Sequence, residues 1–432
     1  MTDDRRFRHV CVLLHDGHVL TDGAGGLPSS LGGEPEIDLA TRARACGDPD
    51  AVLVAPEVEA GRGSLTLLSV FGPRSGSPVD GAWMPMDEVT DDNPAVLAFL
   101  REIASVVGGV VDPPARRPAW FHPGWYDEVD AWIDHSLAAR RRVRTGPTVP
   151  AKVWSLSAVL RVPCDPAPVW FKASCRHFHA EPALTRLVGG MLPEHTPPVV
   201  AADEERAWLL MDEMSGADEE QSEAPPEGLG PAAARIVATL QLRSLEHLEE
   251  IQDAGVAVRG LTETWHGFEE ILAGSIELDE LTPEELATAR EHRGEVRAVF
   301  DELAALGLPE TLVHGDLHPG NVAHHGEALM LYDWSDAAVS HPFLDAVHLL
   351  QRIPELEKDA TRDAYAGPWR AAYPDVDVAR GLELAAQVNT IFQMVTYEQL
   401  CRAIEDASYW EMRGVVARLL KQVPERFPAA GV

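Results

Sequence analysis

The residues with the clearest chemical potential are Asp316 and Asn321, which lie five positions apart in a polar stretch of the chain. A Pro-Gly pair between them interrupts any regular helix or strand, so we expect a loop that directs its side chains outward. A further acid, Asp333, follows twelve residues after Asn321 and ends the apolar run 328–332. Carboxylate and amide oxygens of this kind suit a hard cation such as Mg²⁺.

The elements that position these groups can be predicted from the flanking residues. Residues 328–332 are apolar and follow Gly326, which predicts one arm of a β-hairpin that delivers Asp333 to its tip. Two carboxylates and one amide can then converge. Magnesium binds proteins through one or two carboxylates together with substrate phosphates, so a nucleoside triphosphate is the expected partner. The alternative is an ordinary polar loop without a ligand.

The order His-Gly-Asp, four residues, Asn and then a later Asp resembles the aminoglycoside phosphotransferase family, small-molecule kinases with a protein-kinase-like fold. The resemblance covers the chain from about residue 120 onward and implies a two-lobed α+β fold. By this resemblance Asp316 accepts the proton of the substrate hydroxyl, and Asn321 and Asp333 bind Mg²⁺.

The same resemblance implies a supporting role for two further residues. Residues 340–347 are similar to the family segment whose aspartate braces the catalytic loop through backbone hydrogen bonds, and Asp345 occupies that position. His314 begins the His-Gly-Asp motif and is expected to support the loop with it.

Lys172 is one of only four lysines in the chain and lies inside an apolar run. Residues 153–162 and 168–173 predict a hairpin, and a lysine within it is costly unless it pairs or binds an anion. Lys172 resembles the kinase lysine that contacts the α- and β-phosphates, and Glu181 resembles its acidic partner, although the nine-residue gap is shorter than in protein kinases. The alternative is a lysine at an exposed strand edge.

Nucleotide contacts are expected in two further segments. No Gly-x-Gly-x-x-Gly motif precedes Lys172, and Ser155 and Ser157 occupy the region that cradles phosphates in this family. Hydroxyls and backbone N–H groups can hold phosphate there. Residues 206–211 predict a strand that runs into a polar hinge, where kinases offer backbone groups to adenine; the alternative is a buried strand and turn. The hinge candidates are Met211, Asp212 and Met214.

An acidic segment at residues 246–310 carries 17 Asp and Glu against four Arg, a net charge of 4 − 17 = −13 with His neutral. The family resemblance places such helices beside the acceptor, where acid attracts a cation. Solvated helix faces are the alternative explanation, because the whole chain is acidic. Just before this segment, residues 231–251 predict one helix with Pro in its first turn.

Residues 1–110 form a separate module. Residues 9–15 and 18–20 flank an Asp-Gly pair and predict a β-hairpin, followed by strands at 51–55 and 64–71 and a helix at 93–107. The strand order resembles a Nudix hydrolase scaffold. Residues 31–45 lack the Arg-Glu-x-x-Glu-Glu core of that family, so we expect its fold without its activity.

The chain therefore divides into four predicted parts. A Pro-rich boundary at 111–118 and an amphipathic helix at 124–140 follow the first module. The parts are a Nudix-like domain at 1–110, a linker and docking helix at 111–150, a kinase-like N-lobe at 151–216 and a helical C-lobe with the catalytic loop and acceptor pocket at 217–432.

Composition excludes several classes of function. A net charge of −33 argues against nucleic acids and anionic membranes as partners. The five cysteines form no Cys-x-x-Cys pair, which predicts neither a disulfide framework nor a zinc site. No run approaches the ~18 apolar residues of a membrane span, and the N-terminus has no signal-peptide pattern, so we expect a cytoplasmic protein.

The functional prediction is a phosphotransferase that uses Mg²⁺ and moves the γ-phosphoryl group of ATP or GTP to a hydroxyl of a small molecule. If the acidic segment lines the acceptor pocket, the acceptor is cationic, an aminoglycoside or amino sugar. The main alternative is a non-catalytic nucleotide-binding sensor of kinase-like fold. A protein side chain as acceptor ranks third, because the chain shows no activation-loop signature of the protein-kinase kind.

Overall fold

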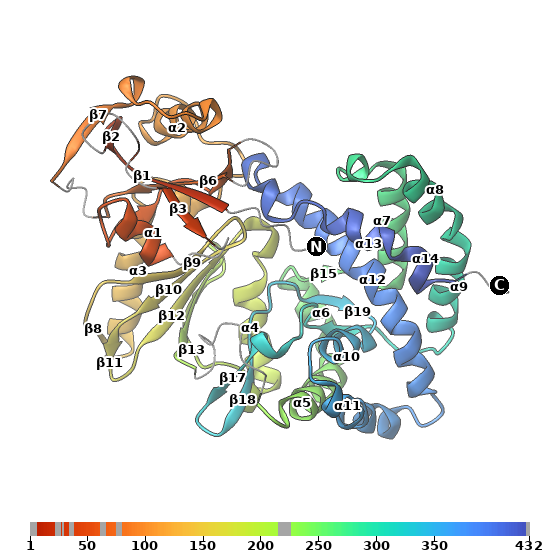
Figure 1. The fold of residues 1–432 in the computed structure, drawn as a ribbon. Coiled ribbons are helices and arrows are strands. Elements are labelled where there is room, and N and C mark those ends of the chain that lie inside the picture. The colour runs from red at the N-terminus through yellow and green to blue at the C-terminus, as the bar shows by residue number, and fades with distance from the viewer. Residues whose placement is uncertain are drawn as a thin grey trace. The chain divides into compact units, whose positions relative to one another are not determined.

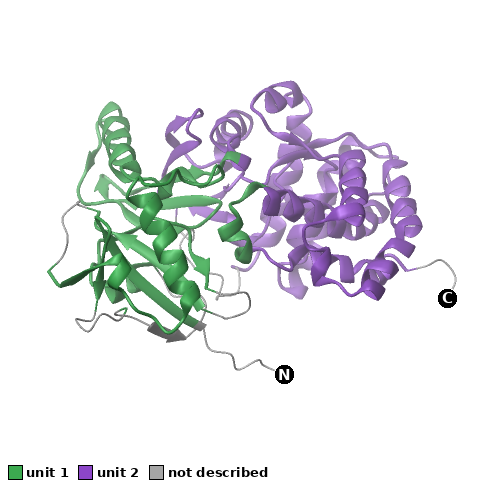
Figure 2. Ribbon diagram, turned by 90° about the horizontal axis from the view of Figure 1, so that it is seen from above, with its two compact units in different colours: residues 1–176, 403–411 green, residues 177–402, 412–432 purple. Residues whose placement is uncertain are grey.

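The computed structural model describes residues 7–21, 27, 30–33, 39–60, 66–74, 80–214 and 226–428. The chain forms two compact units, which Figure 2 shows in green and purple. Unit 1 comprises Met1–Arg176 with Ala403–Glu411, and unit 2 comprises His177–Arg402 with Met412–Val432. Both strands and helices are present in each unit, as the predicted α+β class requires (Figure 1).

The N-terminal hairpin of unit 1 forms as predicted. Strand β1 (Phe7–His15) turns through Asp16 and Gly17, both at positive φ, into β2 (His18–Thr21). Such a turn matches the right-handed twist of the two strands, which is why the Asp-Gly pair marks it. Strand β6 (Thr66–Gly72) runs parallel to β1 on its other side.

The rest of this module completes a seven-stranded sheet with two helices. The helix predicted at 93–107 is present, and the Asn93 side chain caps it by accepting from Ala95 N. The strand predicted at 51–55 is limited to Val52–Leu53. The strand predicted at 64–71 is present from Thr66, while residues 64 and 65 lie outside the described residues. The resemblance to a Nudix scaffold stays a prediction. The remaining elements are β3 (Ser30–Gly33), α1 (Leu39–Ala45), β4 (Val52–Leu53), β5 (Val58–Glu59), β7 (Ala82–Pro85) and α2 (Pro94–Val107).

Unit 1 continues with helix α3 (Trp125–Ala139), which confirms the helix predicted at 124–140. Its apolar residues at three- and four-residue spacing, including Trp125, Val129 and Ile133, are buried. The ring of Trp125 contacts Phe171 with 6.1 Å between centroids. Trp125 therefore belongs to the core, as expected for the apolar face of an amphipathic helix.

The hairpin that carries Lys172 differs from the prediction in one respect. Strand β10 (Ser157–Val162) pairs antiparallel with β12 (Val169–Ser174), but the predicted strand at 153–162 is broken. Strand β9 (Val149–Val153) ends at Val153, and the chain turns so that Trp154 N donates to Ser157 O at 3.1 Å. Apolar composition alone does not reveal this turn. A short pair, β8 (Val143–Arg144) with β11 (Cys164–Asp165), follows the same antiparallel pattern.

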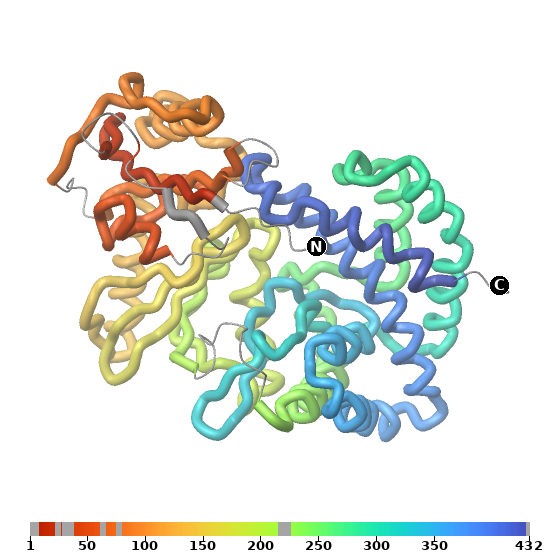
Figure 3. Tube along the Cα trace, viewed as in Figure 1, coloured from red at the N-terminus to blue at the C-terminus, as the bar shows by residue number. Residues whose placement is uncertain are grey.

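A segment from the C-terminal part of the chain returns to unit 1. Residues 403–411, blue in Figure 3, contain a 3₁₀ helix at Asp406–Glu411. Arg117 anchors this segment through Glu405, with Nε–Oε2 at 3.0 Å and Nη2–Oε1 at 2.5 Å. Both side chains are almost fully buried, at 3% and 5% exposed. A buried, bidentate ion pair of this kind fixes the segment strongly.

Unit 2 is mostly helical. Helices α5 (Leu229–Ser244) and α11 (Lys358–Ala372) pack together with α10 (Phe343–Leu350), as Figure 1 shows. The single helix predicted at 231–251 is wrong, because the chain turns after Ser244 and a separate helix α6 (Leu248–Asp253) follows. The Ser244 hydroxyl donates to Gln241 O and accepts from Leu312 N, which ties this break to a neighbouring strand.

The other elements of unit 2 surround this core. Among the described residues, no helix combines the length and the apolar character needed to cross a membrane. The elements are α4 (Glu181–Met191), β13 (Val199–Asp203), β14 (Trp208–Asp212), β15 (Ala257–Val258), α7 (Leu261–Gly274), α8 (Pro283–Glu291), α9 (Arg293–Ala304), β16 (Thr311–Val313), β17 (Val322–His325), β18 (Ala328–Leu331), β19 (Ala338–Ser340), α12 (Val378–Ala403), α13 (Val415–Lys421) and α14 (Val423–Arg426).

The buried pair predicts a large stability effect. We expect Arg117→Ala to lower the free energy of unfolding by about 3–5 kcal/mol, because it leaves the buried Glu405 carboxylate unpaired. The adjacent pair Arg116–Asp406, at 2.6 Å but with side chains 45% and 92% exposed, offers a matched control. Arg116→Ala should cost about 0–1 kcal/mol. Equal effects in chemical denaturation would contradict the assignment.

Candidate active site

The catalytic-loop candidate lies between two strands of unit 2. Strand β16 ends at Val313, the loop then runs to a single 3₁₀ turn at Pro319–Asn321, and β17 begins at Val322. Strand β16 pairs antiparallel with β19, which fixes the start of the loop. The Asp316 side chain is 39% exposed, so its carboxylate is accessible from solvent.

Asp345 holds the start of this loop from helix α10. Its carboxylate accepts hydrogen bonds from His314 N at 2.9 Å and Gly315 N at 3.0 Å, and Gln241 Nε2 donates to it at 3.0 Å. Burial raises the pKa of Asp345 to about 6, although these three donors oppose the rise. Gly315 is needed here, because its φ is +83° and a Cβ would collide with the carbonyl of Asp336.

His314 braces the loop from a second direction. Its side chain is fully buried, and Nε2 lies 2.9 Å from Tyr332 O. Its ring packs on Trp334 with centroids 4.6 Å apart. Burial lowers the pKa of His314, which favours the neutral imidazole. His314 therefore connects the loop to the segment that carries Asp333.

Asn321 and Asp333 meet at the open end of a hairpin. Strands β17 and β18 pair with Val322 opposite Leu331, and Tyr332 N donates to Asn321 O at 3.2 Å. Asp333 follows directly and adopts a left-handed conformation with φ +63°, an uncommon one for a residue other than Gly. The prediction that Asp333 sits at the hairpin tip is wrong, because the turn is formed by Gly326 and its neighbour at the opposite end.

The Asn321 amide is oriented by the backbone of Asp316. Asn321 Nδ2 donates to Asp316 O at 2.8 Å and lies 3.4 Å from Asp316 Oδ2. This orientation leaves the amide oxygen for another partner. One amide oxygen and one carboxylate fit Mg²⁺, which takes few protein ligands and completes its shell with phosphates and water. Among the described residues, no group of three or more His, Cys, Asp or Glu is placed to hold a metal ion by itself.

The hinge candidates Met211, Asp212 and Met214 lie at the end of β14. Met214 is buried in a small apolar cluster with Ala323 and Met330 of the β17–β18 hairpin. The hairpin that ends at Asn321 and Asp333 therefore packs against the predicted adenine hinge. The two segments are about a hundred residues apart in the chain, and no local pattern predicts this contact.

Glu181 begins helix α4 and is 2% exposed. Its Oε2 accepts a hydrogen bond from Ser335 Oγ at 3.0 Å, two residues beyond Asp333. Lys172 belongs to unit 1 and is 7% exposed within β12, so the alternative of an exposed edge lysine is wrong. The pairing of Lys172 with Glu181 stays a prediction.

Ser155 and Ser157 lie at the turn between β9 and β10. The Ser155 hydroxyl donates to the Glu411 carboxylate, and Ser157 Oγ accepts from Trp154 Nε1 at 2.9 Å. Burial raises the pKa of Glu411 to about 7, with Glu57 adding to the rise and Ser155 and Lys152 opposing it. No local pattern predicts the contact with Glu411, because Glu411 lies 256 positions from Ser155.

Two histidines contact Asp316. His348 Nε2 lies 3.0 Å from Oδ1, and His318 Nε2 lies 3.5 Å from Oδ2. Burial would raise the pKa of Asp316, but hydrogen bonds and charge from His318 and His348 hold it well below its ordinary value. Sequence reasoning did not find His348, although its three-residue spacing from Asp345 places both on one face of α10.

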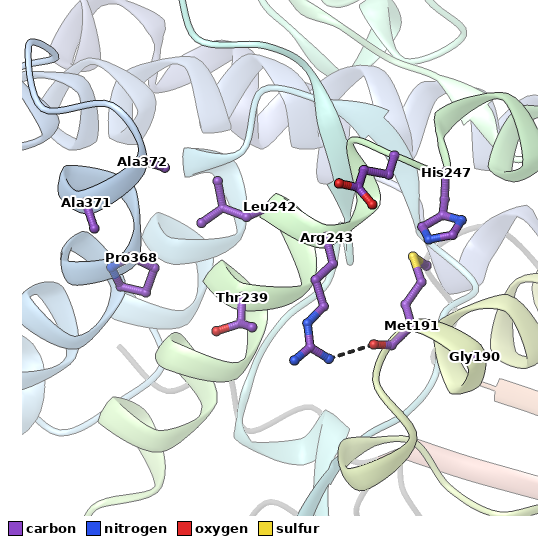
Figure 4. Close-up of a pocket in the computed structure, with 10 residues that line it drawn as sticks. Gly190, Met191, Thr239, Leu242, Arg243, His247, Pro368, Ala371 and Ala372 are labelled. Atoms are coloured by element: carbon purple, nitrogen blue, oxygen red, sulfur yellow. Dashed lines mark hydrogen bonds between the residues drawn. The ribbon is translucent and has the colours of Figure 1, made fainter.

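The predicted site does not coincide with the cavity in Figure 4. That cavity, of about 730 Å³, lies between the end of α4 and helices α5 and α11. Arg243 crosses it and donates to Met191 O at 2.7 Å. None of the residues predicted from the sequence to act in catalysis or binding lines it. Its lining residues are Gly190, Met191, Thr239, Leu242, Arg243, Glu246, His247, Pro368, Ala371 and Ala372.

The chain matches the model of a known protein family. Residues 150–382, more than half of the chain, match the family described as the phosphotransferase enzyme family (APH). A search of curated proteins found no match. The family match includes Lys172, Glu181 and the whole segment from Asp316 to Asp345.

Similar solved structures have 11–17% sequence identity to this chain. Macrolide 2'-phosphotransferase MphH from Brachybacterium faecium has 17% identity and a TM-score of 0.47, covering 67% of this chain and 98% of that one. Choline kinase LicA from Streptococcus pneumoniae has 11% identity and a TM-score of 0.46, covering 69% and 99%. The GDP and kanamycin complex of APH(2")-IIia has 16% identity and a TM-score of 0.45, covering 69% of this chain and 98% of that one.

Glu411 predicts an unusual pH dependence of stability. Its folded-state pKa of about 7 lies above the ordinary glutamate value, so the folded protein retains a proton that the unfolded chain releases. The stabilisation of the fold that protonated Glu411 contributes is therefore present at low pH and is lost as the pH rises towards 7. We expect Glu411→Gln, which is neutral at every pH, to gain Tm relative to wild type between about pH 5 and about pH 8. The exposed neighbour Asp406 provides the control Asp406→Asn, and the same pH response in both variants would contradict the assignment.

Proposed function

Because this chain belongs to the phosphotransferase enzyme family, we propose that it transfers the γ-phosphoryl group of ATP or GTP to a hydroxyl group of a small molecule. The observation that supports the proposal is the set of hydrogen bonds that links the loop carrying Asp316 with Asn321 and with the strand end next to Asp333. One backbone network joins the three: Asn321 Nδ2 reaches Asp316 O, and Tyr332, which precedes Asp333, donates to Asn321 O. This arrangement supports the proposal that Asp316 acts as a base next to a site that binds magnesium and phosphate.

Asp316 is the proposed base. The acceptor O–H donates its proton to the Asp316 carboxylate as the acceptor oxygen bonds to the γ-phosphorus and the bond from phosphorus to the β–γ bridging oxygen breaks. The nucleoside diphosphate leaves with the electron pair of that bond. Phosphoryl transfer requires little covalent chemistry from the protein, so the main contributions are position and charge.

Asn321 and Asp333 are the proposed ligands for Mg²⁺. When bound, magnesium supplies charge neutralisation to the β- and γ-phosphates. Asn321 offers its amide oxygen, since Nδ2 is committed to the Asp316 carbonyl. Asp333 offers a carboxylate from the strand end that His314 and Trp334 hold in place.

The remaining nucleotide contacts follow from the family resemblance. Lys172 contacts the α- and β-phosphates, and Glu181 orients it. The turn that carries Ser155 and Ser157 binds phosphate through its backbone, because both hydroxyls already have partners. Backbone groups of the hinge formed by Met211, Asp212 and Met214 hold the nucleotide base.

The acceptor class is the finer part of the proposal. We propose a cationic small molecule, such as an aminoglycoside or amino sugar, attracted by the acidic segment 246–310. Three acids of this segment already have partners within the protein, so the attraction falls to the other acids of the segment. Glu277 accepts from Gly414 N and Ala417 N, Asp301 pairs with Arg297 at 2.7 Å, and Glu302 pairs with Arg380 at 2.7 Å.

The rival function is a nucleotide sensor without turnover. Lys172, Asp316, Asn321 and Asp333 occur together in the chain, and a degenerate kinase is expected to lack at least one of them. A nucleotide-consumption screen over aminoglycosides, amino sugars, nucleosides and polyols, with mass spectrometry of the products, separates the two functions. A product heavier by one phosphoryl group supports the enzyme, and nucleotide binding without any product supports the sensor.

The base assignment predicts the behaviour of one variant. Asp316→Asn should lower kcat by about 100-fold or more, because it removes the proton acceptor, and should retain nucleotide binding. Asp359 on α11 is 96% exposed and distant in sequence from the loop, so Asp359→Asn serves as the control. Steady-state kinetics with calorimetry of nucleotide binding make the measurement, and near-wild-type turnover of Asp316→Asn rules the role out.

The acceptor assignment predicts a dependence on salt. Charge attraction between exposed groups is screened over ~8 Å at 0.15 M ionic strength, so the KM of a cationic acceptor should rise steeply from low to physiological salt. The KM of a neutral polyol, tested as a second acceptor in the same buffers, serves as the control for salt effects on nucleotide binding. A flat KM, or a product formed only from neutral acceptors, identifies the acidic segment as solvated surface.

A further inference from the structure

One side chain from α10 and one from α12 form a short series of polar contacts that ends at Asp316. His348 of α10 has a side chain that is only 6% exposed, and its Nε2 lies 3.0 Å from Asp316 Oδ1. Gln393 of α12 lies on the far side of the imidazole, with Nε2 at 3.4 Å from His348 Nδ1. Neither residue belongs to the His-Gly-Asp motif, and the proposed reaction has not used them so far.

The contacts of Gln393 fix which of its amide atoms faces the histidine. Its Nε2 also lies 3.1 Å from Gly315 O, a carbonyl that can only accept. The side-chain amide of Gln393 must therefore direct its NH₂ group towards Gly315 O and His348. His348 Nδ1 faces the same NH₂ group, so Nδ1 accepts and Nε2 carries the hydrogen. The Nε2–H bond then points at Asp316 Oδ1.

This arrangement makes the two oxygens of Asp316 unequal. Oδ1 is occupied by the His348 N–H, from a buried side chain on a rigid helix. Oδ2 has only longer contacts, 3.4 Å to Asn321 Nδ2 and 3.5 Å to His318 Nε2. His318 is itself oriented, because its Nδ1 accepts from Gly320 N at 3.1 Å. His318 Nε2 therefore carries a hydrogen that faces Oδ2, but at 3.5 Å this contact is longer than the 3.0 Å contact at Oδ1, so Oδ2 is the less tightly held oxygen and the one assigned to an incoming hydroxyl.

We propose that His348 and Gln393 are positioning residues for the base, with Gln393 setting the imidazole tautomer and His348 holding Oδ1 so that Oδ2 receives the acceptor proton. The proposal rests on the proposed function, in which Asp316 is that base. Gln393 also donates to Gly315 O, so one amide fixes both the loop backbone and the histidine.

The chemical consequence is specific to the transfer step. A hydrogen bond to Oδ1 does not raise the basicity of Asp316; it limits rotation of the carboxylate about its χ2 bond. Correct orientation of reacting groups contributes to turnover, and a misplacement of about 1 Å can cost about 100-fold. Asn321 and Asp333 do not depend on this hydrogen bond, so nucleotide affinity should be unaffected.

The hydrogen-bond arrangement can be tested without any turnover. In the full-length protein labelled with ¹⁵N-histidine, His348, assigned by its loss in His348→Gln, should show the two-bond ¹H–¹⁵N pattern of the Nε2–H tautomer. Gln393→Leu removes the NH₂ group that imposes this tautomer and should shift the pattern towards a mixture. A wild-type Nδ1–H pattern, or an unchanged pattern in Gln393→Leu, overturns the proposal.

The positioning role is tested by kinetics with the acceptor found in the product screen. His348→Ala should lower kcat about 10- to 100-fold with little change in the KM for nucleotide. His348→Gln, whose amide can still donate to Oδ1, should recover part of that loss. Val347 is the preceding residue of α10 and is 3% exposed, so Val347→Ala reports the cost of weakened helix packing alone. It should lower Tm but leave kcat near the wild-type value.

The outcomes separate this inference from the proposed function. If no acceptor is phosphorylated, the proposed function fails, and the tautomer pattern still decides whether the hydrogen-bond arrangement exists. If turnover occurs but His348→Ala keeps the wild-type kcat, the proposed function stands and the positioning role is overturned. The positioning role is also overturned if Val347→Ala and His348→Ala have equal Tm values and the same fall in kcat, because weakened helix packing then explains the effect.

Discussion

The candidate site depends on one buried carboxylate, that of Asp345, which accepts the backbone N–H groups of His314 and Gly315. These N–H groups lie where β16 ends, so they have no partner within a strand, and a buried N–H without a partner is costly. Asp345 satisfies both and thereby fixes the direction in which the loop leaves the strand. Gln241 and Tyr365 extend this network, since Tyr365 Oη donates to Gln241 Oε1 at 2.7 Å.

Hydrogen bonds connect that anchor with three further candidate positions, those of Asp316, Asn321 and Asp333. The fixed loop presents Asp316, and the Asp316 carbonyl orients the Asn321 amide. His314 reaches across to Tyr332 O and thus connects the loop with the strand end at Asp333. Helix α10 supplies both Asp345 and His348, so one rigid element supports the loop backbone and the proposed base together.

Much of this organisation could be predicted from sequence, because the signals are local. The spacing of Asp316, Asn321 and Asp333, the Asp-Gly hairpin and the amphipathic helix at 124–140 each depend on neighbouring residues. The apolar run around Lys172 correctly indicated a buried lysine. The family match, which covers residues 150–382, confirms the resemblance to the phosphotransferase family.

The features that sequence did not show depend on contacts between distant segments or on breaks inside apolar runs. Glu411 reaches Ser155 across 256 positions, and Gln393 reaches His348 across 45. The turn at Trp154 and the break after Ser244 interrupt stretches whose composition alone favours a single element. Asp333 was placed at the wrong end of its hairpin, because an apolar arm does not indicate which end carries the turn.

The proposed site for a magnesium-bound nucleotide, formed by Asp316, Asn321 and Asp333, can be tested by calorimetry of nucleotide binding. ATP and GTP are titrated with and without Mg²⁺ into the wild-type protein and into Asp333→Ala, with Asp301→Ala as a surface control. We expect Mg²⁺ to strengthen nucleotide binding to the wild type and to Asp301→Ala, and we expect Asp333→Ala to lose most of this gain. Equal, magnesium-dependent affinities for wild type and Asp333→Ala would contradict it.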